Sequence, residues 1–530
     1  MSTRRLPVLC VLGLALFGTA GQALAASTPC AQLTALTLED IHVTSAVLTP
    51  AGTFTASGSG RAATPVQLPS FCRVIALATP SSDSVINFEV WLPLSEAWNG
   101  KFEGVGNNAF QGSINYADLA SGLLRGYATA STDTGHIGDD LKFANKHPEK
   151  IVDWGFRAIH LTTEAAKLIV RDYEGRAPQH SYFDGCNTGG HQGLMEAQRY
   201  PDDYDGIVAG DPAADRIHEV AGYLWAWKVT HDQNSQSLLS PADLQLLTKS
   251  AVAACDARDG VKDGVIDDPR RCHFNPETLL CRGQEHTGCL AAPQIEAAKN
   301  IYAGLHNPRT GKVIFPGWPL GSEGFGDTPN LGWNSMINTP EPRRVQLFQY
   351  FVFNDPNWDW RTLDFDKDID YADEKVGFIS ATNPDLDTYK SHGGKLLMYT
   401  GWADPILPAQ DVVDYYDDVT RTMGSAAHTT DFFRLFMVPG MGHCSGGPGT
   451  TQFDMLSALE QWVEQKKPPV TIPAARTSHG VLQRTRPLCM YPKVANWTGN
   501  GSTDNAANFV CSVEAPLKPS TSNSHKGDAQ

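Results

Sequence analysis

A strand–helix alternation is interrupted in the middle of this chain, and the interruption shapes the fold that we expect. From about residue 40 to 210, apolar runs alternate with helix-forming stretches, as at 85–93, 102–106, 127–135, 157–173 and 207–210. The alternation returns with an apolar run at 395–405, a helical stretch at 410–423 and an apolar run at 432–440. Such alternation is typical of a mostly parallel sheet covered by helices. We therefore predict an α/β domain assembled from two separate pieces of the chain.

The stretch between these pieces, residues 211–391, differs from both flanks. It is rich in Pro, Gly, Trp and Asp and shows no regular strand–helix alternation. We interpret it as a domain inserted into an α/β domain that comprises residues 26–210 and 392–511. The polar stretch 512–530 is expected to be a disordered tail.

Residues 1–25 have the features of a secretory signal peptide. Arg4 and Arg5 precede an apolar run that ends at Ala23-Leu24-Ala25, so cleavage after Ala25 predicts a secreted or periplasmic protein. A buried N-terminal helix is the alternative. No other apolar stretch is long enough to cross a bilayer, so we expect no membrane partner.

The charge balance argues against polyanionic partners. The 530 residues carry a formal net charge of −16, and no basic cluster interrupts the acidic composition. Nucleic acids and anionic membrane surfaces are therefore not expected as partners. Oligomeric state cannot be predicted from the sequence.

The cysteines suggest disulfides. Removal of Cys10 with the signal segment would leave ten of the 11 cysteines, an even number that fits disulfide pairing in an exported protein. No C-x-x-C pair is present, so a structural zinc site is not expected. Spacing alone does not fix the pairing, although 255/272, 281/289 and 489/511 are natural local pairs. Cys186 would need a distant partner.

Residues 181–201 have the layout of a strand, a tight turn and a helix. The turn reads Gly185-Cys186-Asn187-Thr188-Gly189. This resembles the G-x-S-x-G elbow that presents a nucleophilic serine in α/β-hydrolases, with Asn187 in the serine position. An amide nitrogen is a poor nucleophile because its lone pair is delocalised, so Asn187 cannot simply replace a serine.

Two later residues complete the chain order of a hydrolase site. Asp404 follows the apolar run that begins at 395, and His443 follows the run that begins at 432. Loops beyond strand ends are where α/β sheets gather catalytic groups. Taken alone, each residue is as well explained as an ordinary loop residue. Together with the elbow, they predict His443 as a general base that Asp404 orients.

The stretch 255–272, called here the acidic loop, is a candidate cation site. Asp256, Asp259 and Asp263 stand among glycines that allow tight turns, and hard cations such as calcium prefer several oxygen ligands on a flexible loop. The spacing is not that of an EF-hand. The alternative is a solvated acidic turn, but carboxylates this close together repel one another.

In these motifs the chain resembles the tannase and feruloyl esterase family, which includes mono(2-hydroxyethyl) terephthalate hydrolases. The family's marks are a Cys-Ser pair at the elbow, an Asp and a His-Cys pair, which match Cys186-Asn187, Asp404 and His443-Cys444. The resemblance covers nearly the whole chain after the signal segment. It implies an α/β-hydrolase core with an inserted lid domain, the segment 211–391.

The resemblance also implies a structural calcium ion and a set of disulfides. The implied calcium ligands are the side chains of Asp256, Asp259 and Asp263 and the carbonyls of Val261 and Val265. The implied disulfides are Cys186–Cys444, Cys30–Cys72, Cys255–Cys272, Cys281–Cys289 and Cys489–Cys511.

Two positions depart from the family pattern. Asn187 replaces the serine, and the glycine-rich oxyanion loop, usually G-x-G-N-G-G, reads GVGNNA at 104–109. We expect the backbone N–H of Thr188 to be one oxyanion donor and that of Gly106 to be the other. The acid, the base, the acidic loop and the cysteines match the family.

The resemblance predicts an exported carboxylic ester hydrolase whose substrate is a small aromatic ester, such as a gallate, ferulate or terephthalate ester. Four interpretations of Asn187 stay open. Thr188 or a water activated by His443 could act as nucleophile, or Asn187 could deamidate to a carboxylate nucleophile. Alternatively, the chain could bind phenolic esters without turnover, or the asparagine could be an engineered substitution that traps a complex.

Overall fold

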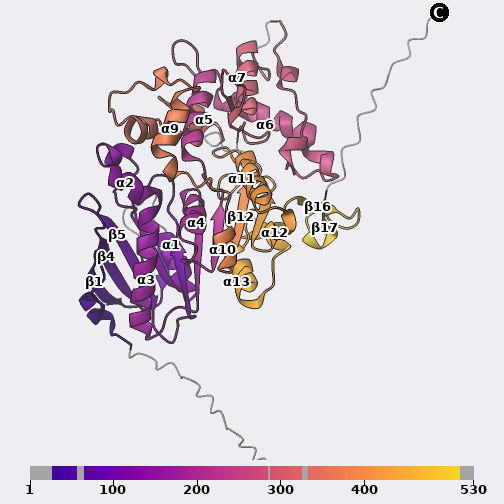
Figure 1. The fold of residues 1–530 in the computed structure, drawn as a ribbon. Coiled ribbons are helices and arrows are strands. Elements are labelled where there is room, and N and C mark those ends of the chain that lie inside the picture. Colours follow the sequence, from indigo (N-terminus) through magenta and orange to yellow (C-terminus); the bar gives the residue numbers. More distant parts are fainter. Residues whose placement is uncertain (1–26, 56–64, 284–286, 325–331, 514–530) are drawn as a thin grey trace, which may run out of the picture.

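The computed structural model describes residues 27–55, 65–283, 287–324 and 332–513, and its centre is a nine-stranded sheet (Figure 1). The strand order is β1-β4-β5-β7-β6-β8-β9-β12-β13. The α/β prediction is confirmed, and helices lie on both faces of the sheet.

The sheet has an antiparallel part and a parallel part. The antiparallel part contains β1 (Ile41–Thr49), β4 (Phe71–Ala78) and β5 (Ile86–Pro93), and β5 pairs antiparallel with β7. The parallel part contains β7 (Ala128–Thr132), β6 (Lys101–Val105), β8 (His180–Cys186), β9 (Gly206–Gly210), β12 (Lys395–Gly401) and β13 (Phe433–Val438). Residues before and after the inserted segment therefore pair side by side, because β9 is the neighbour of β12.

Alternate residues of the parallel strands pack against helices on opposite faces of the sheet. Phe183 and Ile207 belong to the same apolar cluster as residues of α3 (Ala158–Glu174), α4 (Thr188–Arg199) and α11 (Ala409–Thr422). Tyr182 and Val208 belong instead to a cluster with α13 (Met455–Gln465). Since strand side chains alternate between faces, near-continuous apolar strands are what a sheet covered on both sides requires.

The inserted segment supplies most of a second apolar core, which also contains Phe110 and Trp154 from the first piece of the chain. Its main helices are α5 (Arg216–Val229), α6 (Pro241–Cys255), α7 (Ala292–Ala303) and α9 (Asp368–Val376). Most of their buried residues, including Ile217, Leu244, Ile301 and Ile369, belong to one cluster that is separate from the clusters on the sheet. In Figure 1 these helices lie together in the upper part of the molecule, above the sheet.

Shorter elements complete the described chain. They are the helices α1 (Tyr116–Leu124), α2 (Pro148–Val152), α8 (Asn334–Ile337), α10 (Asp387–Ser391) and α12 (Ala426–Thr430), and the two-stranded pairs β2 (Gly52–Phe54) with β3 (Val66–Leu68), β10 (Leu305–His306) with β11 (Val313–Phe315), β14 (Thr471–Ser478) with β15 (Val481–Cys489), and β16 (Lys493–Trp497) with β17 (Phe509–Val513). The last strand includes Ser512 and Val513, so ordered structure extends two residues beyond the predicted start of the tail.

Five disulfides cross-link the described part of the chain. They join Cys30 to Cys72, Cys186 to Cys444, Cys255 to Cys272, Cys281 to Cys289, and Cys489 to Cys511. These are the pairs that the family resemblance implies. The Cys186–Cys444 bond connects residues 258 positions apart in sequence and supplies the distant partner that Cys186 needed.

The predicted signal segment, residues 1–25, lies outside the described residues. Within the described ranges, no helix combines the length and the apolar character that a membrane crossing demands.

Candidate active site

The candidate site residues gather at the carboxyl ends of the parallel strands. Asn187 follows β8, Asp211 follows β9, Asp404 lies three residues after β12, and His443 lies on the loop after β13. Parallel strands all end at one edge of a sheet, so these four loops meet there, although the residues span nearly half of the chain.

Asn187 occupies a strained turn between β8 and α4. Its backbone angles are φ 63° and ψ −115°, a left-handed conformation that side-chain-bearing residues rarely adopt. The surrounding glycines permit the tight approach: a Cβ on Gly185 would lie 2.6 Å from the Cα of Gly189, and a Cβ on Gly106 would lie 2.3 Å from that same atom. The structure therefore contains the elbow predicted from the glycine pattern.

His443 and Asp404 form a buried acid–base pair. The Nδ1 atom of His443 lies 2.7 Å from Oδ2 of Asp404. The other oxygen, Oδ1, accepts the backbone N–H groups of Ile406 at 2.7 Å and Leu407 at 3.0 Å. A carboxylate held in this way fixes the histidine with a proton on Nδ1 and an available lone pair on Nε2.

The elbow side chain faces the free nitrogen of this histidine. Nδ2 of Asn187 lies 2.5 Å from Nε2 of His443, which is the contact that the serine hydroxyl of a catalytic triad makes. With a proton on Nδ1 of His443, the amide N–H of Asn187 donates to Nε2. The geometry of a triad is thus present, with an amide in place of the hydroxyl.

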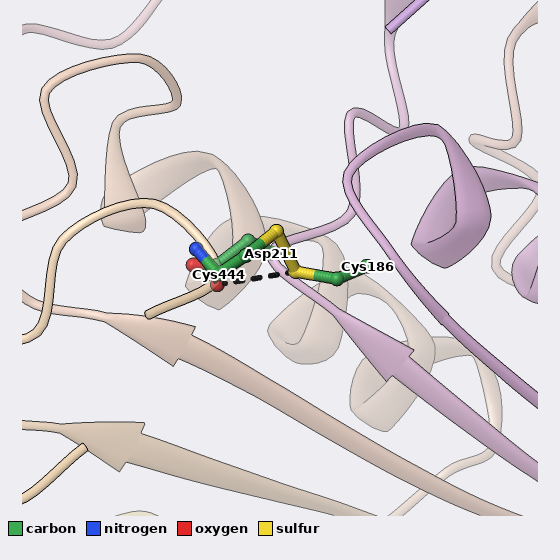
Figure 2. Close-up of side chains that lie close together, drawn as sticks. All are labelled: Cys186, Asp211 and Cys444. Carbon is green, nitrogen blue, oxygen red and sulfur yellow. Dashed lines mark hydrogen bonds between the residues drawn. A yellow bond between two sulfur atoms is a disulfide. The ribbon is translucent and has the colours of Figure 1, made fainter. Parts of the chain in front are cut away.

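Asp211 is a site residue that sequence reasoning missed. Its Oδ1 accepts the Thr400 hydroxyl at 2.8 Å and the Gly401 N–H at 2.9 Å, while its Oδ2 accepts the Cys444 N–H at 2.9 Å. The Cys186 sulfur lies 3.6 Å from Oδ2 (Figure 2), a contact without a proton because that sulfur is in a disulfide. Asp211 thus holds the loop after β13 against the end of β12.

The electrostatics of this cluster favour a protonated histidine. Burial lowers the pKa of His443, but the charge and hydrogen bond of Asp404 and the charge of Asp211 outweigh burial, so the pKa lies above its usual value. Burial and the nearby Asp404 raise the pKa of Asp211 to about 7. Asp211 and His443 therefore influence each other's protonation.

Thr188, the first residue of α4, is held by the inserted segment. Its hydroxyl donates to the carbonyl of Ala109 and accepts a hydrogen bond from the fully buried Arg216 at 2.6 Å. The same hydroxyl lies 3.1 Å from Oδ1 of Asn187. Since Arg216 begins α5, the inserted segment reaches the elbow directly.

The geometry does not support the expected oxyanion role of Gly106. Its N–H donates to the carbonyl of Asp184 at 3.0 Å, so it is already used in the pairing between β6 and β8. The contribution of Gly106 is steric, because a side chain there would collide with Gly189. The N–H of Thr188 lies at a helix start, where backbone donors have no partner within the helix.

The acidic loop is folded by its own carboxylates and by two arginines. Oδ1 of Asp256 accepts the N–H groups of Asp263 at 2.8 Å and Gly264 at 2.9 Å. The Asp263 carboxylate lies 3.0 Å from Arg484 and 2.6 Å from Arg486. Three clusters of His, Cys, Asp or Glu ligand atoms within 4.8 Å of one another occur in the described residues, and none includes the loop acids.

One buried side-chain oxygen of the acidic loop has no hydrogen-bond partner in the described part of the structure. Oδ2 of Asp267 is buried and makes no hydrogen bond within the part of the chain that the structure describes. A buried carboxylate oxygen without a donor is unfavourable unless a cation or water satisfies it. Asp267 was not among the predicted ligands, although it follows them directly in the stretch 263-DGVIDD-268.

Comparison with known proteins agrees with the geometry. The sequence profile described as tannase and feruloyl esterase matches residues 72–512. The chain is 40% identical to an uncharacterized esterase of Xanthomonas campestris pv. campestris over 93% of this chain and 92% of that protein. It is 35% identical to the mono(2-hydroxyethyl) terephthalate hydrolase of Piscinibacter sakaiensis, with coverage of 84% of this chain and 85% of that protein.

Solved structures give the same result. The fold matches feruloyl esterase B from Aspergillus oryzae with a TM-score of 0.84 and 29% identity, over 90% of this chain and 98% of that one. Tannin acyl hydrolase from Aspergillus niger matches with a TM-score of 0.73 at 21% identity, over 90% and 92% of the two chains, a likeness of fold. On the profile match and the similarity to these relatives, the chain belongs to the tannase and feruloyl esterase family.

Proposed function

We propose that the protein hydrolyses esters of aromatic carboxylic acids, such as gallate, ferulate or terephthalate esters. The observation that carries this proposal is the buried Asp404–His443 pair, whose free nitrogen is directed at the elbow residue 2.5 Å away. The names of the relatives, a feruloyl esterase and a mono(2-hydroxyethyl) terephthalate hydrolase, support the aromatic acid.

In the chain as translated, the proposed nucleophile is water. His443 takes a proton from the water as it attacks the ester carbonyl, and Asp404 stabilises the resulting imidazolium. The N–H of Thr188 stabilises the oxyanion. The tetrahedral intermediate then releases the alcohol, which takes the proton from His443. Because no covalent intermediate forms, we expect turnover about 10⁴-fold or more below that of a serine at position 187.

The engaged hydroxyl of Thr188 argues against the alternative in which it acts as the nucleophile. It donates to Ala109 and accepts from Arg216, while the elbow atom beside the base is Nδ2 of Asn187. A nucleophile needs its proton within reach of the base. A water that displaces the Asn187 amide from Nε2 of His443 is therefore our proposed nucleophile in preference to Thr188.

We also propose that residues 211–391 act as a lid with a structural calcium ion in the acidic loop. The contact from Arg216 to Thr188 supports the lid. The unpartnered Asp267 oxygen supports the ion, and the donor set is one of carboxylates and carbonyls, as hard cations prefer. Asp256, Asp259 and Asp263 with the carbonyls of Val261 and Val265 would hold it, with Asp263 shared with its arginines. The ion would neutralise the loop acids.

We also propose that the protein is exported. The sequence of residues 1–25 and the five disulfides support a secreted or periplasmic location, because disulfides persist in oxidising compartments.

The test is acid release from methyl gallate, methyl ferulate and p-nitrophenyl acetate by three proteins: the native chain, Asn187→Ser, and the native chain carrying His443→Ala. We expect Asn187→Ser to be the fastest and the native chain to exceed the His443→Ala control. If neither the native chain nor Asn187→Ser released acid, and circular dichroism showed both proteins to be folded, the esterase proposal would be contradicted.

Binding without turnover is the second candidate function. The observation that favours it is that the Asn187 amide occupies the position from which a nucleophile would give its proton to His443. It predicts a silent native chain, an active Asn187→Ser variant, and binding of methyl ferulate to the native chain in calorimetry.

A further inference from the structure

We propose that Asn187 is a self-modification site: the folded elbow cyclises its side-chain amide onto the Thr188 backbone nitrogen, and hydrolysis of the ring leaves a carboxylate at position 187. The inference deepens the proposed function, because it would place an ionised nucleophile beside His443. The modification itself can be measured without any ester substrate.

The backbone angle at the elbow favours ring closure. Ring closure joins Cγ of Asn187 to the nitrogen of Thr188, so Cβ and that nitrogen must lie on the same side of the Cα–C bond, nearly eclipsed. Around this bond, Cβ of an L-residue stands about 120° from the backbone nitrogen because Cα is tetrahedral. The observed ψ of −115° therefore brings Cβ and the Thr188 nitrogen close to eclipse.

This conformation is uncommon elsewhere in proteins. An asparagine in a helix or a strand has ψ far from this value and must leave its preferred region before it can cyclise. At the elbow the glycine contacts of β8 and α4 impose the required ψ in the ground state. The turn that presents a nucleophile thus also prepares an asparagine for ring closure.

The groups around the Asn187 amide also favour ring closure. Nδ2, the leaving nitrogen, lies 2.5 Å from Nε2 of His443, so a protonated His443 can donate to it as it departs. Oδ1 lies 3.1 Å from the hydroxyl of Thr188, which polarises the amide carbonyl when its proton turns from the Ala109 carbonyl to Oδ1. The attacking N–H belongs to the first residue of α4, so the helix does not use it.

The steps balance as one hydrolysis. The Thr188 nitrogen loses its proton to water and bonds to Cγ of Asn187, the Cγ–Nδ2 bond breaks, and ammonia leaves with a proton from His443. Water then opens the succinimide at Cγ or at the backbone carbonyl, which gives aspartate or isoaspartate. The sum is Asn plus water giving a carboxylate plus ammonia, and no oxidant or cofactor takes part.

The experiment follows the mass of one peptide over time in the intact protein. Freshly purified protein is incubated at pH 7.4 in heavy-oxygen water, then reduced, alkylated and digested with trypsin at mildly acidic pH. The tryptic peptide 177–199 contains Asn187 as its only asparagine. Deamidation adds about one dalton in ordinary water, and incorporation of one heavy oxygen marks ring opening during the incubation.

The matched control is the same protein unfolded and reduced in urea, where the Asn187–Thr188 sequence is unchanged and the elbow angle is lost. We expect deamidation at least about tenfold faster in the folded protein, since the reacting atoms are held in place. A folded rate equal to or below the unfolded rate would overturn the proposal.

Two variants separate the causes. Asn187→Gln lengthens the side chain by one methylene, so the five-membered ring cannot form, and we expect its peptide to keep its mass. His443→Ala removes the proton donor but keeps the elbow, and we expect slower deamidation than in the native chain, with circular dichroism as the check on folding. An unchanged rate in His443→Ala would overturn the assigned role of His443. A protein that deamidates but hydrolyses no ester would contradict the proposed function alone.

Discussion

Two groups of buried carboxylates in this protein differ in how they are satisfied. Beneath His443, each oxygen of Asp404 and Asp211 accepts at least one hydrogen bond from the chain itself. In the acidic loop, Asp267 keeps one buried oxygen without a partner among the described residues. The chain alone satisfies the first group once it folds, whereas the second group keeps one buried oxygen that our proposal assigns to a bound ion.

The difference shows which parts of the protein depend on the fold alone. Because the chain supplies the donors around Asp404, substituting the elbow residue leaves the acid and base in place. The acidic loop, in contrast, should respond to the concentration of a cation.

Loss of the base should have the largest effect. In an Asn187→Ser background, His443→Ala is expected to lower kcat about 10⁵- to 10⁶-fold, because nothing else can take the proton of the nucleophile. Initial rates with methyl ferulate measure the loss, with His479→Ala, an exposed histidine between β14 and β15, as the control. A loss below tenfold would show that His443 is not the base.

Loss of the orienting acid should be the next largest effect. Asp404→Asn in the same background keeps the size of the side chain but presents an N–H to His443, which favours the wrong tautomer, and kcat should fall about 10⁴-fold. Asp418→Asn on the exposed face of α11 is the matched control. Equal rates for the two variants would contradict the assigned role of Asp404.

Calcium should affect the acidic loop and leave the acids beneath His443 unchanged. At a free calcium concentration a hundredfold above Kd, the ion should add about 2.7 kcal/mol to the free energy of unfolding, and Asp259→Asn should abolish most of that gain. Thermal unfolding with calcium, magnesium or a chelator provides the measurement. A melting temperature that calcium does not change would contradict the proposed calcium ion in the acidic loop.

Asp211 should have a small effect on the pKa of His443. His443 must be neutral to act, so activity rises as pH rises through its pKa. Asp211 raises that pKa, and Asp211→Asn removes a negative charge, so the pKa of His443 should fall. The acidic limb of the kcat/KM profile of Asn187→Ser should therefore move to lower pH by about one unit or less. A shift to higher pH would show that Asp211 acts in another way.

Much of this arrangement could be predicted from the sequence. The apolar runs at 102–106, 207–210 and 395–405 contain the parallel strands β6, β9 and β12, of which β9 and β12 are neighbours, and Asp404 and His443 lie on the loops after β12 and β13. These predictions succeeded because strand periodicity and chain order are local signals.

The missed residues carry no local signal. Asp211 and Arg216 lie in the stretch 210-GDPAADR-216, where an acid before a proline indicates only a turn. Their roles arise from partners far away in sequence, Cys444 for Asp211 and Thr188 for Arg216. The expectation for Gly106 failed for the same reason, because whether a backbone N–H is free depends on the neighbouring strand.

Covalent labelling of the elbow tests most directly whether His443 can activate a nucleophile at position 187. On our account the fold keeps the acid, the base and the elbow of a hydrolase site, and the residue translated at position 187 is the one member that is not a nucleophile. A fluorophosphonate added to Asn187→Ser should modify position 187, seen by mass spectrometry of peptide 177–199, and His443→Ala in that background should abolish the label. A folded Asn187→Ser protein that stays unlabelled would contradict the claim, because it would show that the base and the elbow do not work together.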